Sequence, residues 1–96
     1  MPAWKTEKLR LLARAFLSLK TEDEALAFLR DVGTLEELRE WANRFEVAQL
    51  LEAGKSYRDI ARKTGLSTAT VTRVAHWFRY GEGGYKTTIL RKKHSP

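Results

Sequence analysis

The chain has 96 residues, a net charge of +6 and 43% hydrophobic residues. That length suits one domain and leaves no room for a separate catalytic domain, while the hydrophobic content is that of a globular chain. No apolar run approaches the roughly 20 residues of a bilayer-spanning helix, and the N-terminus has no apolar stretch typical of a secretory signal. The lack of cysteine excludes disulfides and thiolate metal sites, and we expect a cytoplasmic protein.

The charge is divided unevenly along the chain. Residues 1–52 contain eight Lys/Arg and ten Asp/Glu, a net −2, whereas residues 53–96 contain ten Lys/Arg and two Asp/Glu, a net +8. A basic half of this kind is typical of a surface that faces a polyanion. An ordinary solvated basic surface would have the same charge, so charge alone leaves both interpretations open.

Capping signals predict two helices at the start of the chain. The first runs from Trp4 to about Leu19, with apolar residues recurring at three- and four-residue steps. Thr21-Glu22-Asp23-Glu24 has the form of a capping box, in which the hydroxyl accepts from a first-turn N–H while the acid reaches back. It predicts a short second helix that ends at Gly33.

Thr34-Leu35-Glu36-Glu37 repeats the capping box and predicts a longer third helix. Gly54 ends it, because glycine takes the left-handed conformation after a helix at low cost. We expect its inward face to carry Leu38, Trp41, Ala42, Phe45, Ala48 and Leu51. Since no β-type alternation occurs anywhere, the prediction is an all-α fold.

The segment SYRDIARKTGLSTATVTRVAHWF, which starts at Ser56, predicts a helix-turn-helix. Ser56 is a hydroxyl N-cap for a two-turn helix that runs through Lys63. Thr64-Gly65-Leu66 forms the turn, and Ser67 caps a second helix that runs to about Arg79.

The spacing of small and branched residues supports this motif. A small residue, Ala61, stands where the two helices cross, Gly65 follows in the left-handed turn, and Val71 packs the second helix onto the first. An αα-hairpin used only for packing is the alternative. The expected motif core is Ile60, Ala61, Gly65, Leu66, Val71 and Val74.

The exposed face of the second helix favours DNA binding. Short hydroxyl side chains and alanine allow close approach to base edges, and an arginine can pair with guanine, whereas a merely structural surface helix would more often carry Glu and Lys. Residues at the start of the first helix can hold a phosphate. We expect the second helix to read bases through Ser67, Thr68, Ala69, Thr70, Thr72, Arg73 and His76, and the first to clamp the backbone through Lys55, Ser56, Tyr57 and Arg58.

Two segments, LLEAGKSYRDIARKTG and STATVTRVAHWFRYGEGGY, resemble the Trp-repressor superfamily, most closely its YerC/YecD-type branch. The upstream TLEELREWANRFEVAQLL corresponds in length and pattern to the long helix before the motif, and the resemblance covers roughly residues 20 to 85. It implies an intertwined homodimer, in which the N-terminal helices of two chains build one core and project two reading heads.

The apolar content makes that homodimer plausible independently. The short helices carry more large apolar side chains than one monomer can point into its own interior, and an obligate dimer would bury them in a shared core. A compact monomer with a large aromatic core is the alternative. We assign to the dimer core Phe16, Phe28, Leu38, Trp41 and Phe45.

The resemblance also implies a site for a corepressor. In tryptophan-dependent members the ligand lies between the long helix and the recognition helix, bracketed by two arginines, and Arg44 and Arg73 fall at the matching positions. Such a pocket needs small residues after the second arginine, but this sequence has Val74 and Trp77 there. We expect these side chains to fill a vestigial ligand pocket, with Trp77 as a plug, and we expect no tryptophan corepressor.

Signals of an enzyme or a metal site are lacking. The two histidines, His76 and His94, are far apart, and no HExxH, GxSxG or P-loop pattern occurs. The run Gly81-Glu82-Gly83-Gly84 is interpreted as the end of the recognition helix and a hinge. We expect no enzymatic activity, no metal and no cofactor.

Three parts are expected within one domain. Residues 1–54 form the core and dimerisation surface, residues 55–80 the helix-turn-helix, and residues 81–96 a glycine hinge and basic tail. The tail could form a last short helix through Ile89 or be a disordered arm along the DNA backbone, and the sequence does not decide between them.

The favoured hypothesis is a sequence-specific transcriptional regulator, a repressor, that binds a pseudo-palindromic operator in double-stranded DNA as a homodimer and makes no membrane contact. One alternative is an accessory module that binds nucleic acid without sequence choice. The other is an adaptor that binds another protein through its aromatic surface.

Overall fold

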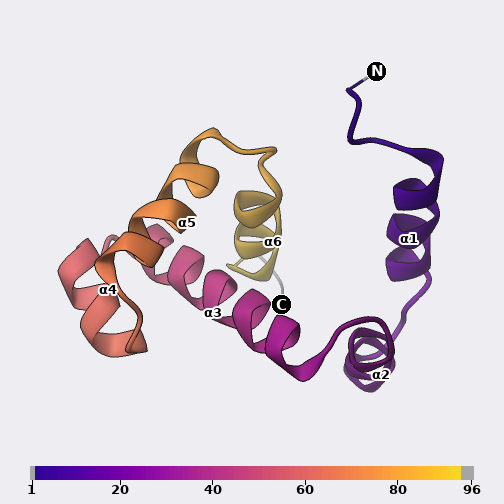
Figure 1. Ribbon diagram of the computed structural model, residues 1–96, viewed down its shortest axis with the longest axis horizontal. Helices are drawn as coiled ribbons and strands as arrows, with labels where there is room; N and C mark the ends of the chain where they lie inside the picture. The colour runs from indigo at the N-terminus through magenta and orange to yellow at the C-terminus, as the bar shows by residue number, and fades with distance from the viewer. Residues whose placement is uncertain (1, 94–96) are drawn as a thin grey trace. The chain divides into compact units, whose positions relative to one another are not determined.

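The computed structural model describes residues 2–93, which form six α-helices and no strand (Figure 1). The predicted all-α fold is confirmed, and His94 lies outside the described residues. None of the described helices is both long and apolar enough to cross a membrane. The helices are α1 (Glu7–Leu17), α2 (Glu22–Val32), α3 (Leu35–Glu52), α4 (Tyr57–Thr64), α5 (Thr68–Tyr80) and α6 (Gly84–Lys93).

The chain divides into two compact units, and the boundary falls inside α3. The N-terminal unit ends at Leu38 and holds α1, α2 and the first turn of α3. The C-terminal unit begins at Arg39 and holds the rest of α3 with α4, α5 and α6.

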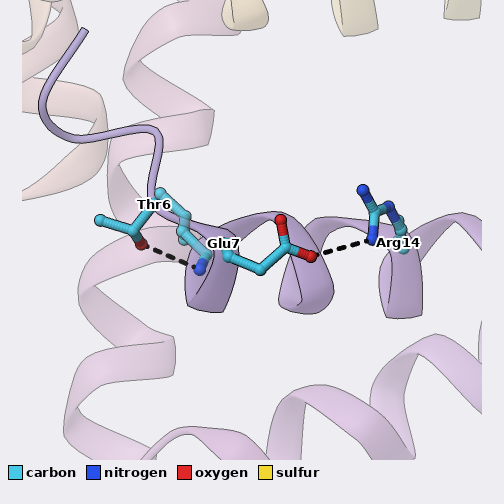
Figure 2. Close-up of polar contacts among 4 residues, drawn as sticks. Thr6, Glu7 and Arg14 are labelled. Atoms are coloured by element: carbon cyan, nitrogen blue, oxygen red, sulfur yellow. Dashed lines mark hydrogen bonds and ion pairs between the residues drawn. The ribbon is translucent and has the colours of Figure 1, made fainter. Parts of the chain in front are cut away.

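Helix α1 begins later than the sequence predicted. Thr6 is extended (φ −75°, ψ 160°) and acts as the N-cap, because its hydroxyl accepts a hydrogen bond from the N–H of Leu9 at 3.1 Å. Trp4 therefore precedes the helix, and the predicted start there was wrong. Figure 2 shows this cap beside an exposed ion pair between Glu7 and Arg14 at 3.3 Å.

Helix α2 begins at the first predicted capping box, but the acid of the box bonds a different backbone N–H than expected. The hydroxyl of Thr21 accepts from the N–H of Glu24 at 3.1 Å, as expected. The Glu24 carboxylate accepts from the N–H of Lys20 at 3.0 Å, one residue before the cap. The helix ends at Gly33, as predicted, but with extended backbone (φ −109°, ψ 150°).

Helix α3 has both of its predicted end signals. The N–H of Glu37 donates to the hydroxyl of Thr34 at 3.1 Å, and the N–H of Thr34 donates to the Glu37 carboxylate at 2.9 Å. At the other end Gly54 is left-handed (φ +83°), and the N–H of Lys55 reaches back to the carbonyl of Leu50 at 3.1 Å. This is the hydrogen bonding of a Schellman motif, which stops a helix cleanly.

The core of the C-terminal unit joins all four of its helices. One cluster unites Val47 of α3, Ile60 of α4, and Val71 and Val74 of α5. A second unites Ala48 of α3, Phe78 of α5 and Ile89 of α6. Of the two possibilities for the tail, the helix is therefore the one observed, and it packs on the core through Ile89.

The inward face predicted for α3 is partly wrong. Trp41 and Ala42 are exposed, whereas Val47, which was not predicted, is fully buried. Ala48 is buried as expected, and the other three predicted positions, Leu38, Phe45 and Leu51, are half-buried. Within this chain, the side of α3 that packs on the other helices of the unit therefore includes both Val47 and Ala48.

The N-terminal unit has no comparable core. No side chain of α1 or α2 is buried, and Phe16 remains 40% exposed. Its ring meets that of Phe28 edge to face, with centroids 5.1 Å apart. Of the aromatic residues of this unit that were assigned to the dimer core, Phe16 is therefore exposed and Phe28 half-buried in the single chain.

Candidate nucleic-acid interface

Helix α4 begins with the predicted hydroxyl cap and a basic, exposed first turn. The hydroxyl of Ser56 accepts from the N–H of Asp59 at 3.1 Å. The Asp59 carboxylate does not reach back to the cap, because it accepts from Arg62 at 2.7 Å. Lys55, Ser56 and Arg58 are exposed, so the start of α4 is free to meet a polyanion such as DNA.

The turn between α4 and α5 depends on one backbone conformation. Gly65 is left-handed (φ +77°), and its N–H donates to the carbonyl of Ala61 at 2.9 Å. A Cβ atom at this position would meet nothing within 4 Å. Glycine is therefore favoured here by the sign of φ and not by lack of space. The predicted turn glycine is in place.

Helix α5 is capped and anchored as the sequence predicted. The hydroxyl of Ser67 accepts from the N–H of Thr70 at 3.1 Å, and the hydroxyls of these two residues are 2.9 Å apart. Val71 is fully buried and Val74 nearly so, which fixes the inner face of the helix against α3 and α4. All six of the other residues predicted to face DNA are exposed, namely Thr68, Ala69, Thr70, Thr72, Arg73 and His76.

The C-terminal half of α5 adds an aromatic group to this face. The His76 ring contacts Trp77 edge to face, with centroids 5.5 Å apart, and lies 5.4 Å from the ring of Tyr80. Trp77 is 58% exposed and Tyr80 74% exposed. Tyr80 was not predicted as a site residue, although its position four residues after His76 places both on one helix face.

Tyr57 and Arg79 link the two helices of the motif. The Tyr57 ring is half-buried against the core cluster, and its hydroxyl accepts a hydrogen bond from the Arg79 guanidinium. The guanidinium carbon also lies 5.6 Å from the centroid of that ring. The hydrogen bond from Arg79 to Tyr57 raises the pKa of Arg79 above its ordinary value. Arg79 was predicted only as a helix end, because its partner is 22 positions away.

The four residues assigned to a ligand pocket do meet at one pocket, of about 540 Å³. Val74 is nearly buried and Trp77 is 58% exposed, and both line this pocket, so an open space lies beside them in the single chain. Arg44 lies 3.8 Å from the carboxylate of Glu40, which also lines the pocket. The complete lining is Glu40, Asn43, Arg44, Leu66, Thr70, Arg73, Val74, Trp77 and Tyr85.

The expectation that Trp77 acts as a plug stays a prediction. Trp77 comes one helical turn after Arg73, and besides this pocket it lines an apolar hollow with Phe45 and Gly81. Val74 lines the pocket and also belongs to the buried cluster with Val47. No group of side chains able to hold a metal ion occurs among residues 2–93.

Comparison with known proteins gives concordant matches over nearly the whole chain. The family model described as Trp repressor protein matches residues 7–93. Protein YerC of Bacillus subtilis (strain 168) is 37% identical over 89 residues, which cover 93% of this chain and 86% of YerC.

Two solved structures share the fold. A TrpR-like protein from Eubacterium eligens ATCC 27750 matches with a TM-score of 0.86 and 45% identity, over 93% of this chain and 92% of that one. A protein from Staphylococcus aureus matches with a TM-score of 0.86 and 29% identity, over 94% of this chain and 90% of that one.

Proposed function

The chain belongs to the Trp repressor family, a family of DNA-binding regulators, and we propose that it is a repressor that binds a pseudo-palindromic operator as a homodimer. The observation that carries the proposal is the capped helix α5, held on a compact core with a continuous exposed face of short polar side chains. Two such helices in a symmetric dimer would meet successive major grooves, about 34 Å apart. Since the relatives are bacterial, the proposed place of action is the cytoplasm, where the chromosome lies.

The two helices of the motif have separate tasks in this proposal. Helix α5 reads base edges, with Arg73 as the side chain able to make a bidentate pair with guanine and the others close enough for methyl and hydroxyl contacts. The start of α4 holds phosphates, which positions α5 without reading sequence. The proposed base-reading set is Ser67, Thr68, Ala69, Thr70, Thr72, Arg73 and His76, and the proposed phosphate-contacting set is Lys55, Ser56, Tyr57 and Arg58.

The exposed apolar surface supports the homodimer. Leu17 is 85% exposed, Leu11 57% and Leu26 55%, all in the N-terminal unit, and water contact with so many large apolar side chains is unfavourable. In the proposed dimer these helices and the core residues Phe16, Phe28, Leu38, Trp41 and Phe45 form a core shared by the two chains. The three proposed parts remain residues 1–54, 55–80 and 81–96, for dimerisation, DNA reading and the basic tail.

We further propose that tryptophan is not the corepressor. The carboxylate of tryptophan would have to bind Arg44. The Glu40 carboxylate already lies 3.8 Å from that arginine, and its negative charge would repel the carboxylate of the ligand. Calorimetric titration with L-tryptophan is expected to show no micromolar binding, and micromolar binding would contradict this part of the proposal.

The experiment that tests the proposal is selection of bound sequences from a random DNA pool, followed by competition binding at fixed salt. A selected site is expected to be preferred over random DNA by about 10³-fold or more. A steep salt dependence with no preferred sequence would instead indicate an accessory module that binds nucleic acid without sequence choice.

Substitution of Arg73 by alanine is expected to remove the contact to one base. Its cost on the selected site should be about 1–3 kcal/mol, with relaxed preference at one base pair, and Thr70→Ala should act in the same way. Binding titrations on the selected site and on its single-base variants measure this. An equal loss on selected and random DNA would contradict the assignment.

Substitution of Lys55 or Arg58 by glutamine is expected to weaken binding to all sequences alike. Removing one cation that neutralises a phosphate should reduce the slope of log affinity against log salt by about 0.9. Titrations of random duplex between low and physiological salt measure the slope. An unchanged slope for both variants would remove the start of α4 from the phosphate-contacting set.

A further inference from the structure

We propose that Arg79 and Tyr57 form a positioning pair that fixes the angle between α4 and α5 and so sets the sequence specificity of the DNA-binding surface. The inference rests on the proposed function and assigns a role to a residue, Arg79, that lies outside both contact sets named above. In this role the pair itself does not contact DNA. It keeps α5 at a fixed angle to α4 and so positions the side chains that contact the bases.

The two residues stand at opposite ends of the motif. Tyr57 is the first residue of α4 and Arg79 the last but one of α5, whereas the turn around Gly65 joins the other ends of these helices. The turn and the core near Ile60 and Val71 fix the helices at the joined ends. The side-chain hydrogen bond from Arg79 to Tyr57 links the two ends that the turn does not join, the start of α4 and the end of α5.

Both partners have the chemistry of a fixed contact. The Tyr57 ring is packed against the buried cluster, so its hydroxyl is presented at a defined place. Arginine is planar and can stack on a ring while donating a hydrogen bond, a combination that the lysine ammonium cannot reproduce.

A change of angle would act on the two kinds of DNA contact differently. Base contacts need side-chain atoms placed to within a fraction of an ångström, whereas attraction to phosphates depends mainly on charge. A loosened motif should therefore lose affinity for the selected site and keep its affinity for random DNA. The ratio of these two affinities separates positioning by the pair from a direct phosphate contact.

The variants are Tyr57→Phe, Arg79→Lys and the double variant, each of which preserves net charge and the bulk of the side chain. Arg62→Lys is the matched control, since Arg62 is an exposed arginine that pairs with Asp59 of its own helix. Affinity for the selected site and for random duplex, the salt slope, and the thermal midpoint are measured for each.

Each single variant is expected to lower the ratio of specific to random affinity by roughly 3- to 10-fold, the size of effect of one ordinary intramolecular hydrogen bond in water. The double variant should lose no more than either single one, because both remove the same hydrogen bond. The salt slope of every variant, and both affinities of Arg62→Lys, should stay at the wild-type values. Unchanged affinity for random duplex is expected of Arg79→Lys alone, because the Tyr57 hydroxyl also belongs to the proposed phosphate-contacting set. Additive losses of the affinity ratio, or an equal loss on both DNAs in Arg79→Lys, would overturn the proposal.

A second measurement needs no DNA, so it also separates failure of this inference from failure of the proposed function. Rotation of the Arg79 guanidinium, followed by nuclear magnetic resonance of its side-chain N–H groups, is expected to be hindered in the wild type and free in Tyr57→Phe. Rotation equally free in both proteins would overturn the positioning pair. Hindered rotation in a wild type without sequence preference would contradict the regulator proposal alone.

Discussion

The two compact units of this chain bury their side chains in opposite ways. The C-terminal unit encloses Ile60, Val47 and Val71 completely, and each of its helices contributes to one of two joined clusters. The N-terminal unit has no buried side chain in α1 or α2. A short helix is stable only when its apolar face packs against other side chains, either in the same chain or in a partner. In the N-terminal unit this apolar face remains exposed.

Local interactions define the helices of the N-terminal unit. Thr6, Thr21 and Thr34 each cap a helix through a hydroxyl, and an ion pair joins Glu7 to Arg14 along α1 (Figure 2). Each N-cap contributes about 1 kcal/mol and an exposed ion pair less than that. Such interactions set where a helix starts but are too weak to hold it alone. The N-terminal unit therefore depends on burial supplied from outside it, which the proposed homodimer would provide.

The largest expected effect comes from truncating the core of the C-terminal unit. Ile60→Ala should lower the free energy of unfolding by about 2–5 kcal/mol, because Ile60 is fully buried among valines and the cavity left behind cannot collapse completely. Urea unfolding at one fixed protein concentration measures the loss. Ile60→Val is the graded control, with an expected loss of about 0.5–1.5 kcal/mol. If the alanine variant loses no more than the valine variant, this core is not what stabilises the unit.

A somewhat smaller effect is expected in the N-terminal unit, and it concerns assembly. Phe16→Glu should raise the dissociation constant of the homodimer by roughly 30-fold, as expected for an aromatic contact worth about 2 kcal/mol at the centre of an interface. Sedimentation over a range of protein concentrations measures this. Lys8→Glu, at an exposed position of the same helix, should leave the constant unchanged. A monomeric wild type would contradict the homodimer and favour the adaptor alternative.

The smallest effect tests the capping box of α3. Hydrogen bonds from the backbone N–H and the side chain of Thr34 lower the pKa of Glu37 below its ordinary value of 4.5. A carboxyl whose pKa is lower in the folded state adds stability above about pH 4.5, and this contribution is lost as the pH falls through the folded pKa. Glu37→Gln should therefore lose less stability than the wild type on acidification from about pH 5 to 3. The free energy of unfolding is measured at each pH, with Glu36→Gln as the control. Identical pH profiles for Glu37→Gln and the wild type would contradict the capping role of Glu37.

Local signals in the sequence were sufficient to predict the helix-turn-helix. Each of its main features follows from the chemistry of one residue and its near neighbours. These features are the hydroxyl caps at Ser56 and Ser67, the left-handed Gly65 and the buried Val71. Start and stop signals act over one helical turn, so they can be read without knowledge of the rest of the chain.

Features that depend on distant partners could not be predicted in this way. The inward face of α3 includes Val47 and not Trp41 because α4 and α5 pack on that side, and no signal within α3 itself indicates which side they take. The pocket lined by Arg44 of α3, Trp77 of α5 and Tyr85 of α6 depends on how three separate helices pack together. Helix α6 carries apolar and basic residues all round, so only packing on the core distinguishes Ile89 from its neighbours.

The turn at Gly65 has a consequence for how sequences of this kind can vary. The position is open on all sides, with nothing within 4 Å of where a side chain would begin, yet its backbone has φ +77°. Which residues fit at position 65 therefore depends on whether their backbone can adopt a positive φ, and not on the volume of their side chain. Asparagine, the side-chain-bearing residue that adopts this conformation most readily, is the substitution such a turn would tolerate best. A larger or charged side chain attached there would extend into solvent and leave the core untouched, so the cost of new surface chemistry at position 65 is the backbone strain of a left-handed residue alone.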